Sequence, residues 1–127
     1  MWEISAAAVL SARHRIRMVS GVAREEGLVH AHRWRIRAVV RARQLDATGW
    51  VLDFHELTAA LRALLAPYDG AFINDVPPFD DVNPTRENIA RVLADKLAGQ
   101  LNDDRVRVHA LEISEDDVCC ATYFPDP

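Results

Sequence analysis

Residues 29–43 read VHAHRWRIRAVVRAR, and this stretch decides the fold class. Arginines recur at alternate positions, while histidines and apolar residues fill most of the positions between them. Side chains on a β-strand point alternately to the two faces of the sheet, so this period of two predicts a strand with one buried face. The arginine face holds Arg33, Arg35, Arg37 and Arg41, and the other face holds His30, His32, Trp34, Ile36, Ala38 and Val40.

An earlier strand is predicted over residues 2–18, because the same alternation appears near its end. There Arg13, Arg15 and Arg17 alternate with His14, Ile16 and Met18. Residues 19–28 contain two glycines and two adjacent glutamates, and we expect a loop there. The two strands are then neighbours, and His14 lies on the same apolar side as His30 and His32.

A helix is predicted after the second strand. Asp53 can cap it, with Glu56 three residues later as in a capping box, and Pro67 stops it. Its apolar residues recur at helical spacing and are Leu57, Leu61, Leu64 and Leu65. Residues 68–82 carry two adjacent prolines and four aspartates, and we expect a loop there.

A second helix has a clear start signal. Asn83 is placed as its cap and Pro84 as its first helical residue, while Gly99 is placed to end it. Its buried stripe is predicted to be Ile89, Val92, Leu93 and Leu97.

The last two strands are predicted at residues 105–113 and 117–124, joined by a short acidic turn. In the first of them, one face is expected to hold Val106, Val108, Ala110 and Glu112. The order β-β-α-α-β-β predicts an α+β fold in a single domain, residues 1–127, with a four-stranded antiparallel sheet and both helices on one face. Such a sheet has edges that need protection, so we expect a homo-oligomer.

The composition excludes several classes of protein. Half of the 127 residues are apolar and 27% are charged, a balance typical of a globular chain and not of a disordered one. The net charge of −4 argues against a general nucleic-acid binder. No apolar run approaches the ~20 residues of a membrane span, and the first residues do not resemble a signal peptide, so we expect a soluble, cytoplasmic protein with no membrane partner. The adjacent Cys119 and Cys120 imply no disulfide framework.

Three histidines form the first candidate site. His30 and His32 leave the same face of one strand, and His14 lies near the end of its neighbour. Catalytic zinc sites use three protein ligands and leave the fourth position open, and imidazole suits zinc. The pattern therefore indicates a zinc site, although a His-x-His pair alone also occurs as two ordinary strand histidines.

Three carboxylates are further candidates. Glu112, on an otherwise apolar face, must pair or bind something, unless the strand frays at that point. Glu26 lies just before the histidine pair and could act as a general acid or base beside a metal, or could be one charge of a solvated loop with Glu25. Asp69 could relay a proton, or could simply be a turn residue after the first helix.

The order of these motifs is more specific than any one of them. The motifs are Ser11-Ala12-Arg13-His14-Arg15-Ile16, His30-Ala31-His32, Gly49-Trp50-Val51-Leu52-Asp53-Phe54, Asp69 with Phe72-Ile73-Asn74, Asn83-Pro84-Thr85-Arg86-Glu87-Asn88, and Glu112. Together they resemble the 6-pyruvoyltetrahydropterin synthase family, which includes the 6-carboxytetrahydropterin synthases of queuosine biosynthesis. The resemblance extends from about residue 4 to residue 123.

The resemblance implies a tunnelling fold, or T-fold, in which the sheets of a trimer close a barrel and two trimers stack into a hexamer. It implies a zinc cofactor held by the three histidines. It also implies a pterin pocket at a subunit interface, with Glu112 anchoring the pterin ring and with Thr85 and Glu87 helping to form the pocket. The implied substrate is 7,8-dihydroneopterin triphosphate or a related dihydropterin. The implied reaction is that of a carbon–oxygen or carbon–carbon lyase, by elimination or side-chain cleavage.

Three positions depart from the family pattern. Ala31 replaces the glycine of the usual His-Gly-His, a small change that should leave the ligands in place. The usual catalytic cysteine is replaced by Glu26, as in a subgroup of the family that cleaves the pterin side chain by a retro-aldol-like reaction. The usual Asp-His pair is Asp69-Gly70 here, so the relay histidine is absent, and the proton transfers are expected to fall to Glu26 and Asp69. The alternative is a divergent member that binds zinc and a pterin or purine-like ligand without the standard activity.

Overall fold

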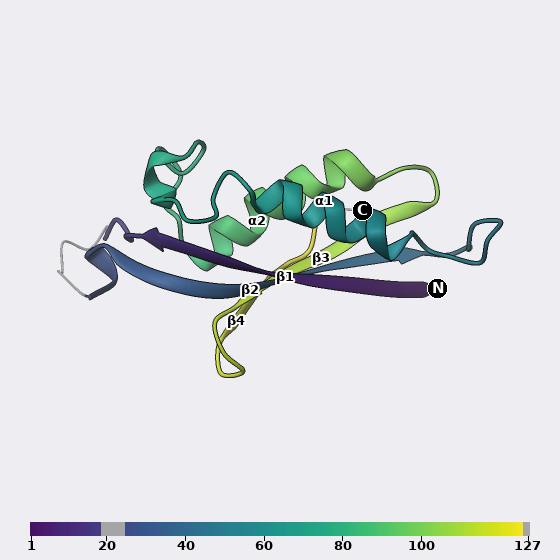
Figure 1. Ribbon diagram of the computed structural model, residues 1–127, viewed down its shortest axis with the longest axis horizontal. Coiled ribbons are helices and arrows are strands. Elements are labelled where there is room, and N and C mark those ends of the chain that lie inside the picture. Colours follow the sequence, from purple (N-terminus) through teal and green to yellow (C-terminus); the bar gives the residue numbers. More distant parts are fainter. Residues whose placement is uncertain (19–24, 126–127) are drawn as a thin grey trace.

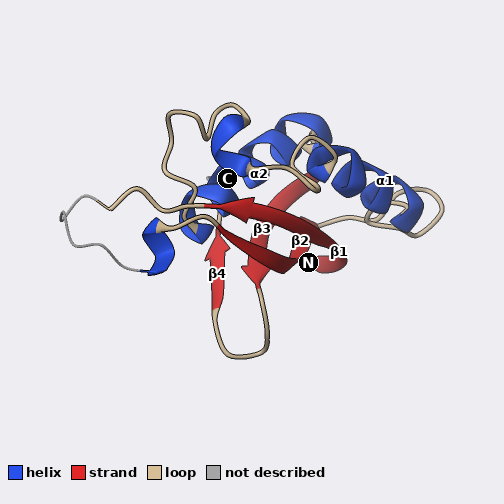
Figure 2. Cartoon of the chain, turned by 60° about the vertical axis from the view of Figure 1, so that its left-hand side comes forward, coloured by secondary structure: helices blue, strands red, loops and turns tan. Residues whose placement is uncertain are grey.

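The computed structural model describes residues 1–18 and 25–125 of the chain. Four strands form one antiparallel sheet in the order β1-β2-β3-β4, and two helices cover one of its faces (Figures 1 and 2). The predicted α+β architecture is confirmed. The elements are β1 (Trp2–His14), the 3₁₀ turn η1 (Glu25–Gly27), β2 (His30–Ala42), α1 (Phe54–Leu65), the 3₁₀ turn η2 (Ile73–Asp75), α2 (Arg86–Leu101), β3 (Val106–Ser114) and β4 (Cys120–Tyr123).

The core lies between the sheet and the helices. β1 and β2 pair without interruption, from Trp2 opposite Ala42 to His14 opposite His30. This register places alternate residues of both strands under the helices, where they meet the two apolar stripes that the sequence predicts. The buried stripe residues are Leu57, Leu61, Leu64 and Leu65 of α1 and Ile89, Val92, Leu93 and Leu97 of α2. Burying one such side chain contributes about 1.5–3 kcal/mol, so this layer is the main source of stability.

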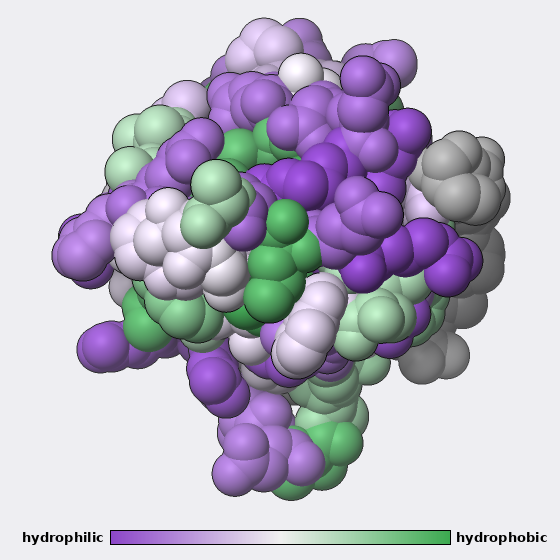
Figure 3. Space-filling view, turned by 90° about the vertical axis from the view of Figure 1, so that its right-hand side faces the viewer, coloured by the Kyte–Doolittle hydropathy of each residue, from purple (hydrophilic) through white to green (hydrophobic). Residues whose placement is uncertain are grey.

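The face of the molecule seen in Figure 3 is mostly polar. In the view of Figure 3 hydrophilic residues dominate, and the apolar residues form small, separate patches. In residues 1–18 and 25–125, no helix is long and apolar enough to cross a membrane. The turn between β3 and β4 projects away from the sheet on the side opposite the helices (Figure 1).

The predicted start of α1 is confirmed, whereas both predicted ends of α2 are wrong. The Asp53 side chain accepts a hydrogen bond from the His55 backbone N–H and caps α1. In α2 the cap is Thr85, not Asn83, because the Asn83 side chain is bound to another segment. Gly99 lies inside α2, which continues to Leu101.

β1 is shorter than the predicted strand 2–18, because its last residues pair with side chains instead of a strand. The amide of Asn74 accepts from Arg15 N and donates to Arg15 O, at 2.9 and 3.0 Å. The amide of Asn83 bonds Arg17 in the same way, at 2.9 Å for each contact. These two asparagines therefore hold the chain beyond His14 in place. Of the predicted loop 19–28, residues 19–24 lie outside the described part of the chain.

A β-bulge reverses the pattern of β3. The register passes from Val40 opposite Val108 to Val39 opposite Ala110, which leaves His109 as an extra residue. Such an extra residue changes the face to which every later side chain points. The prediction that Glu112 shares a face with Val106 and Val108 is therefore wrong, because Leu111 and Ile113 continue the buried face instead. Glu112 lies opposite Arg37 on the other face of the sheet.

The paired asparagine contacts lead to a test of stability. Replacing Asn83 or Asn74 with alanine removes two hydrogen bonds to backbone groups, and each variant is expected to lose about 1–3 kcal/mol of unfolding free energy in urea. Asp80→Ala, an exposed substitution in the same connection, is the control and should unfold at the wild-type urea concentration. An Asn83→Ala protein as stable as this control would contradict the role of the asparagine.

Candidate active site

Three imidazoles converge at the end of the sheet where β1 stops and β2 begins. His14 pairs with His30 across the strands, and His32 lies opposite Ala12, two pairs further along. The ring centroids are 4.6 Å apart for His14 and His30, 4.9 Å for His14 and His32, and 4.6 Å for His30 and His32. One nitrogen from each ring lies within 4.8 Å of the other two. The predicted histidine cluster is thus present as a group that could hold a metal ion.

Hydrogen bonds set which nitrogen of these rings is free. His14 Nδ1 lies 2.9 Å from the backbone oxygen of Pro84, and His30 Nδ1 lies 2.6 Å from that of Leu28. A carbonyl oxygen only accepts, so Nδ1 carries a proton in both rings, and in the neutral form of such a ring Nε2 is the nitrogen with the free lone pair. His14 Nε2 is buried and has no hydrogen-bond partner among the described residues. Neutral imidazoles with one nitrogen tied to a carbonyl are the form in which histidine binds metals, so the residues present fit a zinc ion.

The site disfavours positive charge on His14. The pKa of His14 is lowered from 6.5 to about 4, chiefly by burial and also by the nearby His30, His32 and Arg86, while the bond to Pro84 acts in the opposite direction. His14 is 3% exposed, so its ring has little water to stabilise a proton. At neutral pH its ring is therefore neutral, the form in which a histidine can bind a metal.

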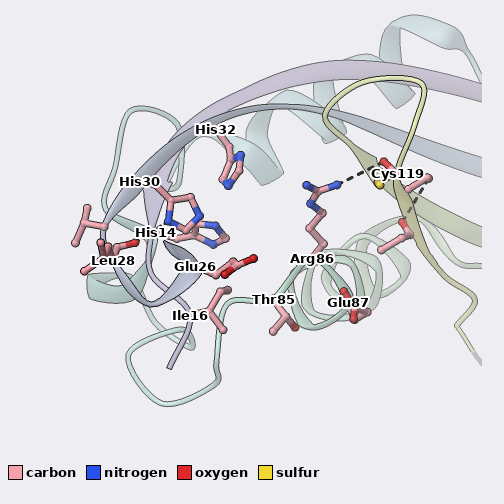
Figure 4. A pocket seen from close by; sticks show the side chains of 13 residues that line it. His14, Ile16, Glu26, Leu28, His30, His32, Thr85, Arg86, Glu87 and Cys119 are labelled. Carbon is pink, nitrogen blue, oxygen red and sulfur yellow. Dashed lines mark hydrogen bonds between the residues drawn. The ribbon is translucent and has the colours of Figure 1, made fainter. Parts of the chain in front are cut away.

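A pocket of about 850 Å³ opens in front of the histidines. It contains the predicted residues Glu26, Thr85 and Glu87 as well as the three rings (Figure 4). Figure 4 shows the Glu26 side chain directed into the space between the rings and the start of α2. The backbone oxygen of Glu26 accepts from Ile16 N at 2.7 Å, which ties η1 to the segment that the two asparagines hold. The full lining is His14, Ile16, Glu26, Leu28, Val29, His30, His32, Thr85, Arg86, Glu87, Cys119, Cys120 and Ala121.

Two predicted site residues lie outside this pocket. Asp69 follows α1, and its Oδ1 accepts from Ser11 N at 3.2 Å. Glu112 forms an ion pair with Arg37 at 2.9 Å across β2 and β3, on the sheet face away from the helices. Within one copy of the chain, neither carboxylate lines the histidine pocket.

The sequence patterns did not single out Arg86 and Glu115 as site residues. Arg86 is the first residue of α2 and lines the pocket. Glu115 lies in the turn after β3, and its Oε1 is 3.0 Å from His32 Nδ1. Arg86 belongs to the Asn-Pro-Thr-x-Glu-Asn motif, but as its variable residue, and a glutamate in an acidic turn carries no pattern that distinguishes it.

The sequence and the fold match a known family. The model of the 6-pyruvoyl tetrahydropterin synthase family matches residues 3–126. The chain is also similar to the solved 6-pyruvoyl tetrahydropterin synthase of Caenorhabditis elegans, with 21% identity over 98% of this chain and 96% of that one, and a TM-score of 0.83.

Two further solved structures have the same fold. One is the uncharacterized protein WS1659 of Wolinella succinogenes, with 16% identity, 98% of each chain covered and a TM-score of 0.79. The other is a Plasmodium vivax 6-pyruvoyltetrahydropterin synthase in which a catalytic glutamate is replaced by cysteine, with 17% identity, coverage of 99% of this chain and 98% of that chain, and a TM-score of 0.77. At such identities the likeness establishes the fold.

The lowered pKa of His14 predicts how the metal-free protein responds to acid. Below pH 6.5 the unfolded chain takes up a proton on this residue, whereas the folded chain does so only near pH 4. The stabilising effect of the neutral ring is therefore complete above pH 6.5 and is lost as the pH falls to 4, by up to about 3 kcal/mol at 1.36 kcal/mol per pKa unit.

Urea unfolding in the presence of a chelator, at several values between pH 7 and pH 4, measures this loss. The His14→Gln variant should show a smaller fall in stability over this range than the wild type. His55→Gln, which changes a fully exposed histidine, should leave the fall unchanged. Equal pH dependence in the wild type and His14→Gln would contradict the burial effect.

Proposed function

Because the chain belongs to the 6-pyruvoyl tetrahydropterin synthase family, we propose that it is a zinc-dependent enzyme that converts a dihydropterin. Its proposed substrate is 7,8-dihydroneopterin triphosphate or dihydroneopterin, and its proposed reaction is the elimination or cleavage of the pterin side chain. In the terms of reaction classes it is a carbon–oxygen or carbon–carbon lyase.

One observation carries the proposal. The free Nε2 atom of His14 and the carboxylate of Glu26 belong to the same pocket, which is large enough for a bicyclic ligand of this kind. A metal beside a positioned carboxylate is the arrangement that proton abstraction next to an oxygen-bearing carbon needs. In this proposal the three histidines hold the zinc, which when bound supplies Lewis-acid polarisation of the substrate oxygens.

Glu26 is the proposed general acid and base. It takes the place of the cysteine that is usual in the family, and η1 places its side chain at the mouth of the histidine cluster (Figure 4). The Plasmodium vivax protein whose catalytic residue is a glutamate supports this assignment. Thr85 and Glu87, on the opposite side of the pocket, are the proposed contacts for the pterin ring.

Glu112 and Asp69 keep their proposed roles only under stated conditions. Since Glu112 lies outside the pocket of its own chain, it can anchor a pterin ring only if a second copy brings its own pocket to that face. A trimer or hexamer built through the sheet edges β1 and β4 is the proposed assembly, since both edge strands offer unpaired backbone groups. Asp69 reaches the site only through the backbone of β1, so any effect on proton transfer would be indirect.

The position of Asp69 also favours a second candidate function. The relay histidine of the family is Gly70 in this chain, and the adjacent carboxylate does not line the pocket. A protein with the metal site but without this relay would bind zinc and a pterin or purine-like ligand without converting it.

Turnover of candidate substrates separates the two functions. Zinc-replete protein is incubated with 7,8-dihydroneopterin triphosphate and, separately, with dihydroneopterin, and the products are identified by mass spectrometry. We expect a 6-carboxy-, 6-pyruvoyl- or 6-hydroxymethyl-pterin. Glu26→Gln should lower the rate by about 10²–10⁴-fold, the contribution typical of a general acid or base, while its zinc content stays unchanged.

Glu56→Gln, in the first turn of α1, is the matched control and should retain wild-type turnover. Absence of product from either substrate, with zinc bound, would favour the binding protein over the enzyme. Full turnover by Glu26→Gln would leave the enzyme in place and remove Glu26 from its mechanism.

A further inference from the structure

The three histidines differ in what holds them. His14 and His30 face backbone oxygens through Nδ1, which no substitution of a neighbouring side chain can remove directly. His32 instead has a carboxylate as its neighbour, because Glu115 Oε1 lies 3.0 Å from its Nδ1 atom. The side chain of His32 is 17% exposed, so water has little access to this nitrogen.

Nδ1 of His32 is buried and has no hydrogen bond among the described residues. The 3.0 Å distance from Nδ1 to Glu115 Oε1 is short enough for a hydrogen bond, but the two groups are not aligned well enough to form one. The ring of Trp34 also constrains the ring of His32. The two rings are stacked, with their centroids 4.9 Å apart and an angle of 18° between their planes. Buried polar atoms in folded proteins are nearly always paired, and a small turn of the ring toward Glu115 would pair this one.

Glu115 is itself held in place. Its second oxygen, Oε2, lies 3.4 Å from Arg86 Nη2, and Arg86 Nη1 donates to the backbone oxygen of Cys119 at 3.4 Å. The turn between β3 and β4 is thus fastened near both ends to Arg86, the first residue of α2. Figure 4 shows the contact of Arg86 with Cys119. The carboxylate is held near His32 by a contact that does not involve His32.

We propose that Glu115 is a positioning residue of the metal centre: it accepts the Nδ1 proton of His32 and so presents Nε2 to the metal. The proposal rests on the part of the proposed function that places zinc on the three histidines. Carboxylates in this position fix the tautomer and orientation of a ligating imidazole and make it a stronger ligand, and their loss costs about 10–100-fold in metal affinity.

Zinc affinity, measured by competition with a chromophoric chelator, is the first test. Glu115→Ala is expected to bind zinc about 10–100-fold more weakly than the wild type. Glu115→Gln retains an oxygen that can accept from Nδ1 and should recover part of the loss. Asp117→Asn changes an exposed carboxylate of the same turn and should bind zinc as the wild type does. Wild-type affinity in Glu115→Ala would overturn the proposal.

The tautomer of His32 in metal-free protein gives a second readout that needs neither zinc nor substrate. Nitrogen-15 NMR of the ring at pH 8 should show the proton on Nδ1 in the wild type, and a shift toward Nε2 in Glu115→Ala. An unchanged tautomer would overturn the proposal even if zinc binds. If the wild type binds no zinc, the metal centre of the proposed function fails, whereas a tautomer that depends on Glu115 would still support the positioning role.

Discussion

The antiparallel register of β1 and β2 is the constraint on which the rest of the structure depends. The same pairing that puts Leu10 beside Trp34 in the core also puts His14 beside His30 at the end of the sheet. A shift of one residue in either strand would send the core side chains to the outer face and would also separate the histidines. Stability and the candidate metal centre therefore share one structural cause, and the burial of an apolar sheet face supplies the energy that keeps the three imidazole rings together.

The segment from Asn83 to Arg86 connects the end of β1 to α2 and to the β3–β4 turn, beside the pocket. Asn83 binds the chain beyond β1, Pro84 accepts from His14, Thr85 caps α2, and Arg86 reaches the β3–β4 turn. These four consecutive residues contact the chain beyond β1, one ring of the pocket and the β3–β4 turn. In sequence this motif looks like an ordinary helix start, but in the structure it connects the elements that surround the pocket.

The strands, the helix stripes and the histidine cluster could be predicted from the sequence because each depends on local periodicity. Most of the signals that failed involve contacts between distant residues. Asn83 is a good cap by its type, but the backbone of Arg17 competes for its side chain, so the cap moves to Thr85. Glu112 changes faces because of one extra residue in β3, and Glu115 meets His32 only through the turn after that strand. No spacing rule contains such information, since it arises when separate elements pack.

The bulge at His109 also limits how this chain can vary in length over evolution. Before the bulge the even-numbered residues of β3 face the helices, and after it the odd-numbered residues do. The core side chains of β3 therefore point inward only when the extra residue is retained. Losing one residue there would turn Leu111 and Ile113 outward and bring the charge of Glu112 under the helices, at a cost that few domains could survive. Substitutions can accumulate along β3, but insertions and deletions within it should be among the changes that selection removes first.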